Sequence, residues 1–430
     1  MGDATVVRMQ WSTAQEAVMV VERGGRVLIG SGAAAPLGLL GALCERSRAL
    51  SNVEVCQILT LGDAPYTAPD LAAHIRHNAF FIGDNTRPAI DEGRADFTPV
   101  FLSEIASLLR GPLPLDVALV QVTPPDAHGY CSLGVSVDIV KAAVDTARLV
   151  VAEVNPRMPR THGDSFIHVS RIARCVQVDH AIPELHVGAP DERARAIGRH
   201  VADLVRDGDT LQLGIGAIPN AVLSELGSHR DLGIHTEMFS DGVVDLFERG
   251  VVNCAKKTLH RGKLVTSFVM GTKRVYDFVD DNPAIEMHPS HYVNDPFVIA
   301  KNRGMVAINS ALAVDVTGQV CADSLGPRFY SGVGGQVDFI RGSARGEGGR
   351  PIIAIPSTAK NGTASRIVLS HASGAGITTT RNDVHFVVTE YGAAELHGKS
   401  IRARVHALAS IAHPDFREEL LRGARALRWI

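Results

Sequence analysis

Short apolar runs alternate with stretches of helical periodicity along most of the chain. The runs are rich in Val, Leu and Ile, a composition typical of strands buried in parallel sheets. The clearest are Arg26–Ile29, Val53–Leu61, Val117–Val122 and Leu149–Val154. Residues 37–48 and 191–206 have apolar positions at helical spacing. This alternation predicts an α/β protein built on open, mainly parallel sheets.

One strand, turn and helix pattern occurs twice. Residues 27–40 (VLIGSGAAAPLGLL) and 211–223 (LQLGIGAIPNAVL) each combine an apolar run, a G-x-G turn, a proline near the expected helix start and an apolar helix. We interpret the pair as an internal duplication that produces two similar domains, because the shared proline and spacing go beyond an ordinary glycine turn. The proline-spaced stretch 179–190 predicts a boundary, with domains at 1–185 and 186–430.

Composition and charge exclude several classes of protein. The 430 residues are 45% hydrophobic and 21% charged, as in globular proteins, and 43 Lys and Arg against 46 Asp and Glu give a net charge of −3 without a basic block. Six dispersed cysteines form no zinc or disulfide pattern, and Met1–Trp11 lacks the features of a signal peptide. No run reaches the roughly 20 apolar residues of a membrane helix. We therefore expect a soluble, cytoplasmic protein that binds neither nucleic acid nor membrane.

The glycine loops do not complete a nucleotide-binding fingerprint. A Rossmann loop needs G-x-G-x-x-G, but Ala35 and Pro219 occupy the third position in the two loops. Residues 392–400 (GAAELHGKS) resemble a Walker A loop with one residue too many, and no helix is expected to open at Lys399. The eighteen histidines are scattered without ligand spacing, so we predict no metal site.

A single carboxylate stands out at the end of an expected strand. Residues 234–239 are predicted to form a strand, 240–242 a turn and 243–249 a short helix, so Glu237 lies near the strand's C-terminal end. Ligands bind at that edge of an open α/β sheet. A solvated glutamate would also fit this position, and residue type alone favours that interpretation.

Several separated motifs together resemble one family. The segment HTEMFSDG (235–242), with LGIGAIP (213–219) before it and SGVGGQVDF (331–339) and TTTRNDVHFVVTEYG (378–392) after it, is similar to the acetyl-CoA hydrolase/transferase family, in the branch of 4-hydroxybutyrate and butyrate CoA-transferases. The stretches VTPPDAHGYCSLG (122–134) and IAHPDF (411–416) are also similar to that family. The resemblance covers nearly the whole chain.

The resemblance implies a role for each of several residues. Glu237 matches the family's nucleophilic glutamate. The residues implied for CoA binding and oxyanion stabilisation are Gly214, Ile215, Gly216, Ala217, Ile218, Gly332, Gly334, Gly335, Asn309 and Lys360. Those implied for the acyl pocket are Asp126, His128 and Met238. An ordinary glutamate pKa of about 4.3 would leave the nucleophile ionised without a general base.

The expected activity is transfer of CoA between a short-chain acyl-CoA and a carboxylic acid through a glutamyl-CoA thioester. Coenzyme A would be a substrate, no tightly bound cofactor is expected, and the family implies a homodimer or a higher homo-oligomer. Three alternatives stay open at this point: an acyl-CoA hydrolase on the same scaffold, a transferase for a dicarboxylate such as succinate or itaconate, and a sugar-phosphate isomerase or deaminase on a related fold. A non-catalytic binding protein of the same ancestry is a further possibility.

Overall fold

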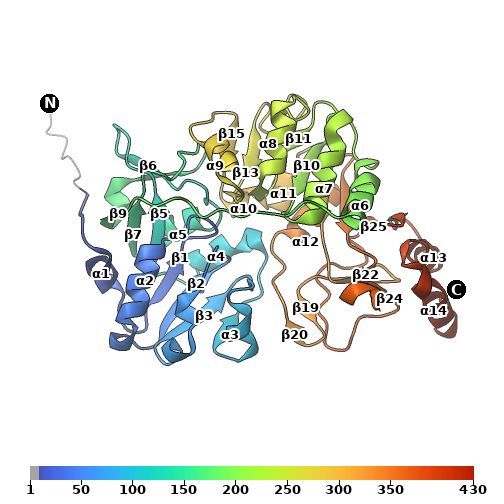
Figure 1. The fold of residues 1–430 in the computed structure, drawn as a ribbon, viewed down its shortest axis with the longest axis horizontal. Coiled ribbons are helices and arrows are strands. Elements are labelled where there is room, and N and C mark those ends of the chain that lie inside the picture. The colour runs from blue at the N-terminus through green and yellow to red at the C-terminus, as the bar shows by residue number, and fades with distance from the viewer. Residues whose placement is uncertain (1–8) are drawn as a thin grey trace. The chain divides into compact units, whose positions relative to one another are not determined.

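A computed structural model describes residues 9–430 and divides into two compact units (Figure 1). Among the described residues, unit 1 comprises 9–185 and 266–291, and unit 2 comprises 186–265 and 292–430. The chain passes from unit 1 to unit 2 between residues 185 and 186, and the segment 266–291 packs with unit 1 although it follows the start of unit 2 in the sequence. The division into domains at 1–185 and 186–430 stays a prediction. Residues 1–8 of the segment assessed for a signal peptide lie outside the described residues.

Unit 1 is built on a seven-stranded parallel sheet with helices around it (Figure 1). Its strands are, in spatial order, β4 (Ala95–Phe97), β3 (Ile75–Ala79), β2 (Val53–Gln57), β1 (Arg26–Ile29), β5 (Val117–Val122), β7 (Leu149–Val154) and β9 (Ile172–Gln177). The helices are α1 (Ala14–Ala17), α2 (Leu37–Arg46), α3 (Arg87–Asp91), α4 (Ile105–Arg110), α5 (Val140–Thr146) and α9 (Lys273–Val279). Short strands in this unit are β6 (Tyr130–Ser132), β8 (Phe166–His168), β14 (Phe268–Val269) and β15 (Ile285–Met287).

Unit 2 contains a six-stranded sheet whose last strand is antiparallel. Its strands are, in spatial order, β11 (Gly233–Ile234), β10 (Thr210–Leu213), β16 (Met305–Asn309), β21 (Arg350–Ala354), β25 (Phe386–Thr389) and β26 (Gly392–Glu395). The helices are α6 (Glu192–Ala202), α7 (Ala217–Glu225), α8 (Asp241–Glu248), α11 (Pro296–Ile299), α12 (Gln336–Arg345), α13 (Ile401–Ile411) and α14 (Pro414–Ala426); α10 (Ser290–Val293) runs across the boundary in sequence.

Shorter strands lie within the connections between the main elements of unit 2. They are β12 (Met238–Phe239), β13 (Leu264–Thr266, whose last residue is assigned to unit 1), β17 (Ala313–Asp315), β18 (Val320–Cys321), β19 (Ser324–Leu325), β20 (Arg328–Phe329), β22 (Thr358–Ala359), β23 (Ala364–Ser365) and β24 (Ile367–Val368).

The order in which the chain adds strands reverses in the same way in both sheets. In unit 1 the chain builds β2 to β4 on one side of β1 and then returns to place β5 on its other side. In unit 2 the chain places β11 beside β10 and then returns to place β16 on the opposite side. Each sheet thus has a switch point next to the strand that precedes its glycine loop. Loops at such a point diverge and leave a crevice for a ligand.

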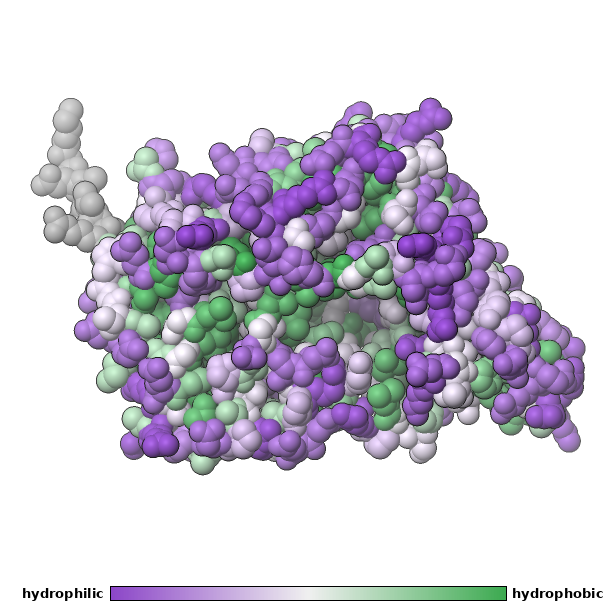
Figure 2. Space-filling view, viewed as in Figure 1, coloured by the Kyte–Doolittle hydropathy of each residue, from purple (hydrophilic) through white to green (hydrophobic). Residues whose placement is uncertain are grey.

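Each unit has its own apolar core. In unit 1, α2 packs its buried residues Leu39, Leu40 and Leu43 against strand residues that include Val27 and Val55. In unit 2, a cluster around Ile353 and Val387 joins the sheet to α13 and α14. Hydrophilic residues cover most of the face seen in Figure 2. Within residues 9–430, the helices are too short or too polar to cross a membrane.

Candidate active site

The expected strand through Glu237 is interrupted at the glutamate itself. The sequence predicts one strand over 234–239, but the structure forms β11 at Gly233–Ile234, a bend at Glu237 and β12 at Met238–Phe239. Helix α8 then begins at Asp241, two residues earlier than predicted. The prediction of one strand was wrong because Thr236 uses its side chain to bind backbone: its Oγ1 lies 2.9 Å from Leu213 O and 3.1 Å from Met238 O. The bend releases Glu237 from strand pairing.

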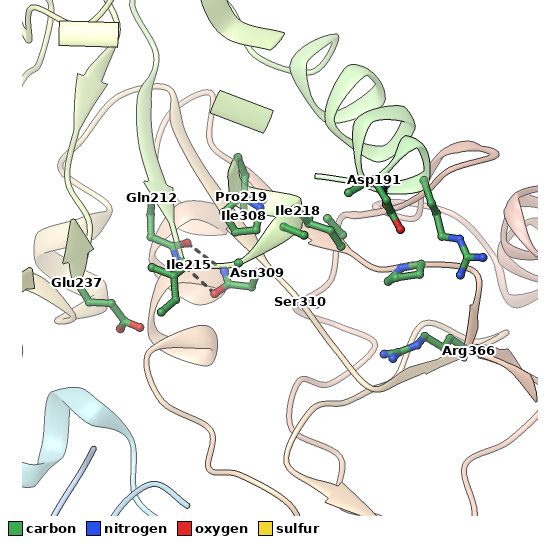
Figure 3. Close-up of a pocket in the computed structure, with 17 residues that line it drawn as sticks. Asp191, Gln212, Ile215, Ile218, Pro219, Glu237, Ile308, Asn309, Ser310 and Arg366 are labelled. Atoms are coloured by element: carbon green, nitrogen blue, oxygen red, sulfur yellow. Dashed lines mark hydrogen bonds between the residues drawn. The ribbon is translucent and has the colours of Figure 1, made fainter. Parts of the chain in front are cut away.

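Glu237 lines a cavity of about 440 Å³ that lies within unit 2 (Figure 3). This volume is in the range of small-molecule binding sites. The lining residues are Asp191, Arg193, Ala194, Gln212, Gly214, Ile215, Gly216, Ala217, Ile218, Pro219, Glu237, Ile308, Asn309, Ser310, Ala354, Pro356 and Arg366. They come mainly from the ends of β10, β16 and β21 and from the start of α7, so the cavity occupies the switch point of the sheet.

Helix α7 directs its first turn into this cavity. It begins directly after Gly216, whose φ of 121° is unfavourable for any residue with a side chain. The first N–H groups of a helix have no partner within the helix, and Gly216 offers no side chain to cap them. The segment 214–218 therefore presents main-chain donors and the positive end of a helix dipole to a negatively charged ligand.

A second helix start lies against the Glu237 carboxylate. Gly335 immediately precedes α12, and a Cβ atom at this position would overlap both Glu237 Oε2 and Asn294 Nδ2. The buried Asn294 amide donates a hydrogen bond of 2.6 Å from Nδ2 to Glu237 Oε2. The glycine is needed here for close approach and not for its backbone angles, since its φ is −95°.

The environment changes the charge state expected for the nucleophile. Glu237 as a residue is half-buried, and burial of its carboxylate raises its pKa to about 7, while the hydrogen bond from Asn294 acts in the opposite direction. The ordinary pKa assumed from the sequence is therefore corrected upward. Near neutral pH the side chain exists as a mixture of acid and carboxylate.

Two amide side chains form a polar pair in the cavity wall. Asn309 Nδ2 donates to Gln212 Oε1 at 3.0 Å, and Gln212 Nε2 lies 3.4 Å from Asn309 Oδ1. Gln212 is the next-to-last residue of β10, and Asn309 is the last residue of the adjacent strand β16. Figure 3 shows the pair within the lining, with Glu237 to one side and Asp191 and Arg366 to the other.

The structure brings together most, but not all, of the residues singled out by sequence. Gly214, Ile215, Gly216, Ala217, Ile218 and Asn309 line the cavity with Glu237, and Gly335 lies against Glu237 without lining it. Gly332, Gly334 and Lys360 are not among the lining residues, and Met238 is buried beside Glu237 in the chain. Asp126 and His128 belong to unit 1. There Asp126 pairs with Arg160 at 2.6 Å and accepts the His128 N–H at 2.8 Å.

Sequence reasoning missed Asn294, Gln212, Asp191 and Arg193. Gln212 carried a usable signal, because it is a polar residue inside an otherwise apolar strand close to a glycine loop. Asn294 carried none, since its role depends on a contact with Glu237 across 57 positions of the chain.

Comparison with known proteins identifies the family. Residues 3–186 match the model of the acetyl-CoA hydrolase/transferase N-terminal domain, and residues 271–424 match that of the C-terminal domain. The chain belongs to the acetyl-CoA hydrolase/transferase family. The fold expected from the family, two α/β domains with open parallel sheets, is confirmed.

Members of this family are similar to the chain over nearly its full length. A 4-hydroxybutyrate coenzyme A transferase from Clostridium kluyveri is 51% identical, with 95% of this chain and 96% of that protein covered. A succinyl-CoA:acetate/propanoyl-CoA:succinate CoA transferase from Fasciola hepatica is 49% identical, with 96% and 87% covered. The crystal structure of 4-hydroxybutyrate CoA-transferase from Porphyromonas gingivalis superposes with a TM-score of 0.85 at 44% identity, covering 97% of this chain and 98% of that one.

Proposed function

We propose that this protein is an acyl-CoA:carboxylate CoA-transferase with Glu237 as its nucleophile. The observation that carries the proposal is a carboxylate in a cavity of suitable size, placed beside two helix starts and a buried amide donor. High identity to proteins named as CoA-transferases supports the same activity. We take 4-hydroxybutyrate as the first acceptor acid to test, since two of these relatives carry it in their names.

The first half of the reaction moves CoA onto the enzyme. A carboxylate oxygen of ionised Glu237 bonds to the thioester carbonyl carbon of the acyl-CoA, the C–S bond breaks, and CoA leaves as a thiolate, so that a mixed anhydride of the acyl group and Glu237 is formed. The thiolate then attacks the glutamyl carbonyl of this anhydride. Its C–O bond breaks, so the acyl group departs as a carboxylate and a glutamyl-CoA thioester remains.

The acceptor acid reverses these steps. Its carboxylate attacks the glutamyl thioester, CoA thiolate leaves, and the thiolate attacks the acceptor carbonyl of the new anhydride to give acyl-CoA and free Glu237 carboxylate. No proton is gained or lost overall. Each intermediate keeps an activated acyl bond, so the sequence of steps requires no nucleotide hydrolysis.

The arrangement provides donors for the oxyanions that these attacks create. The Asn294 amide and the main-chain N–H groups at the starts of α7 and α12 are the groups we assign to this role. One such preorganised donor typically contributes roughly 3–4 kcal/mol to acyl transfer.

Arg193 and Arg366, which line the same cavity, are the cations we propose for the phosphate groups of CoA. Roles in the acyl pocket for Asp126, His128 and Met238, and CoA contacts from Lys360, Gly332 and Gly334, stay predictions.

Trapping the covalent intermediate tests this proposal. Protein incubated with acetyl-CoA is treated with borohydride or hydroxylamine, and Glu237 is examined by peptide mass spectrometry. We expect modification at Glu237 that disappears when unreacted acetyl-CoA is removed and 4-hydroxybutyrate is added before the trapping reagent. A Glu237→Gln variant that still transfers CoA at the wild-type rate would contradict the assignment.

A panel of acids separates transferase from hydrolase. With acetyl-CoA as donor, the rate should depend on added 4-hydroxybutyrate, butyrate, propionate or succinate and follow ping-pong kinetics. Release of acetate at the same rate without any added acid would instead indicate the hydrolase alternative. Exclusion of water from the glutamyl thioester is the physical difference between the two activities.

The family also supports three further proposals: a homodimer, a location in the cytoplasm and the absence of a tightly bound cofactor. Light scattering of the purified protein tests the oligomeric state, and cell fractionation tests the location. Mass spectrometry of the supernatant left after the protein is denatured tests for a bound cofactor.

A further inference from the structure

A buried histidine lies two residues before Glu237. His235 is fully buried in unit 2, and its backbone N–H donates to Leu211 O at 3.1 Å. The imidazole Nε2 is 2.9 Å from Val293 O. Because a carbonyl oxygen can only accept, Nε2 must carry the proton and donate this bond.

The acceptor of that bond belongs to the residue next to Asn294. Asn294 in turn donates to Glu237 Oε2 at 2.6 Å. His235 and Glu237, two residues apart, therefore hold two consecutive residues of another segment, Val293 and Asn294. The result is a small closed ring of covalent and hydrogen bonds that includes the proposed nucleophile.

Thr236 lies between these two residues and contacts a different neighbour. Its hydroxyl donates to Leu213 O at 2.9 Å, and the Leu213 N–H lies 3.3 Å from the same Oγ1. Leu213 immediately precedes the glycine loop 214–216. The short segment 235–237 is thus attached to Leu213, just before the glycine loop, by its middle residue, to Val293 by His235 and to Asn294 by Glu237.

The imidazole also faces the helix that follows Gly335. His235 and Phe339 meet edge to face, with ring centroids 6.2 Å apart, and Phe339 lies in α12. Phe339 and Val293 share a buried apolar cluster with Val265, Ile299, Met305 and Ala307. His235 is consequently packed beside both elements that approach the Glu237 carboxylate.

We infer that His235 is a positioning residue, which sets the place of the Asn294 amide relative to the Glu237 carboxylate through its hydrogen bond to Val293. This inference rests on the proposed role of Glu237 as nucleophile. A buried histidine that merely satisfies a carbonyl would stabilise the fold without affecting the reaction, so the test must separate the two roles.

The chain offers a matched control for a merely structural histidine. His77 in unit 1 is 1% exposed, and its Nδ1 lies 2.9 Å from Val55 O. It resembles His235 in burial and in acceptor type, but its acceptor is in a strand of the unit 1 sheet. His77→Ala should lower stability and leave the rate per folded molecule unchanged.

Removing the His235 donor should alter catalysis in a specific way. For His235→Ala we expect kcat per folded molecule to fall roughly 10–100-fold, as for other small displacements of reacting groups. The hydrogen bond from Asn294 lowers the pKa of Glu237, so its loosening should move the acidic limb of the kcat/KM profile to higher pH. His235→Gln places an N–H donor near the Nε2 position and should restore part of kcat.

A double-mutant cycle with Asn294→Ala decides the question. If His235 acts through Asn294, adding His235→Ala to the Asn294→Ala variant should reduce kcat by less than about twofold. Independent, multiplicative losses, or a pH profile unchanged in His235→Ala, would overturn the inference. Circular dichroism and active-site titration with the trapping reagent correct each rate for folded protein.

The result can be distinguished from failure of the proposed function. Activity that survives in Glu237→Gln would reject the nucleophile, and with it the basis of the inference. An inactive Glu237→Gln variant combined with multiplicative effects in the cycle would reject only the positioning role of His235.

Discussion

At the residue scale, opposing effects act on the Glu237 carboxylate. Burial favours the neutral acid, whereas the Asn294 amide and the adjacent start of α12 favour negative charge. The result is a pKa of about 7, well above that of a solvated glutamate. A carboxylate of raised pKa is a better nucleophile once ionised, but a smaller fraction is ionised at neutral pH.

We predict that kcat/KM for the acyl-CoA rises with pH, reaches half its maximum at about pH 7 and levels off only at higher pH. Only the ionised form of Glu237 attacks, and kcat/KM reports ionisation in the free enzyme. Initial rates with acetyl-CoA at fixed, saturating 4-hydroxybutyrate across this range provide the measurement. A profile that is flat down to pH 5 would show that the nucleophile keeps an ordinary pKa.

Shortening the nucleophile by one methylene should also be harmful. In Glu237→Asp the carboxylate is retained but retracted from the Asn294 donor and from the first turn of α12. We expect kcat to fall roughly 100-fold with little change in stability. Steady-state kinetics and thermal unfolding of the same preparation measure both. Wild-type kcat in this variant would indicate that the position of the carboxylate is unimportant.

At the element scale, close approach between a loop and a side chain defines the site. We predict that Gly335→Ala lowers kcat more than tenfold, since its Cβ would overlap Glu237 Oε2 and Asn294 Nδ2 and must displace at least one of them. Gly41→Ala in α2 is the matched control, because no atom lies within 4 Å of the Cβ added there. That control should retain activity and gain a little helix stability.

Comparison of expected and observed elements shows what local sequence can determine. The strands at 26–29, 117–122 and 149–154 were predicted with their observed bounds. A short apolar run that forms a buried strand of a parallel sheet can be recognised from the local sequence alone. The strand through Glu237 was predicted without its interruption. Its break depends on hydrogen bonds from Thr236 to backbone atoms that no periodicity reveals.

The candidate site was predictable to a similar extent. The glycine loop and Glu237 were found from motifs, whereas the family resemblance supplied their roles. Asn294 was not found, because its contact joins two segments far apart in the chain. The raised pKa of Glu237 was also beyond reach, since burial of a side chain depends on every element that packs around it.

At the scale of the whole molecule, the site and the stability of the fold are linked through the same carboxylate. The pKa of Glu237 is raised in the folded chain to about 7, from an unfolded value near 4.5. Between these two pH values the folded state binds more protons than the unfolded state. The contribution of this group to stability is therefore fully present below about pH 4.5 and is lost as pH rises toward 7.

This linkage predicts that Glu237→Gln stabilises the protein above pH 7 and not at pH 4.5. The amide keeps the shape of the side chain and its position beside Asn294, but it does not place a charge in a poorly solvated site. Because the residue is half-buried, we expect a gain on the order of 1 kcal/mol, well below the full value of the pKa shift. Thermal midpoints of wild type and variant at the two pH values measure it. An equal midpoint difference at both would mean that the carboxylate titrates alike in the folded and unfolded chain, and the kinetic pH dependence predicted above would then need another source.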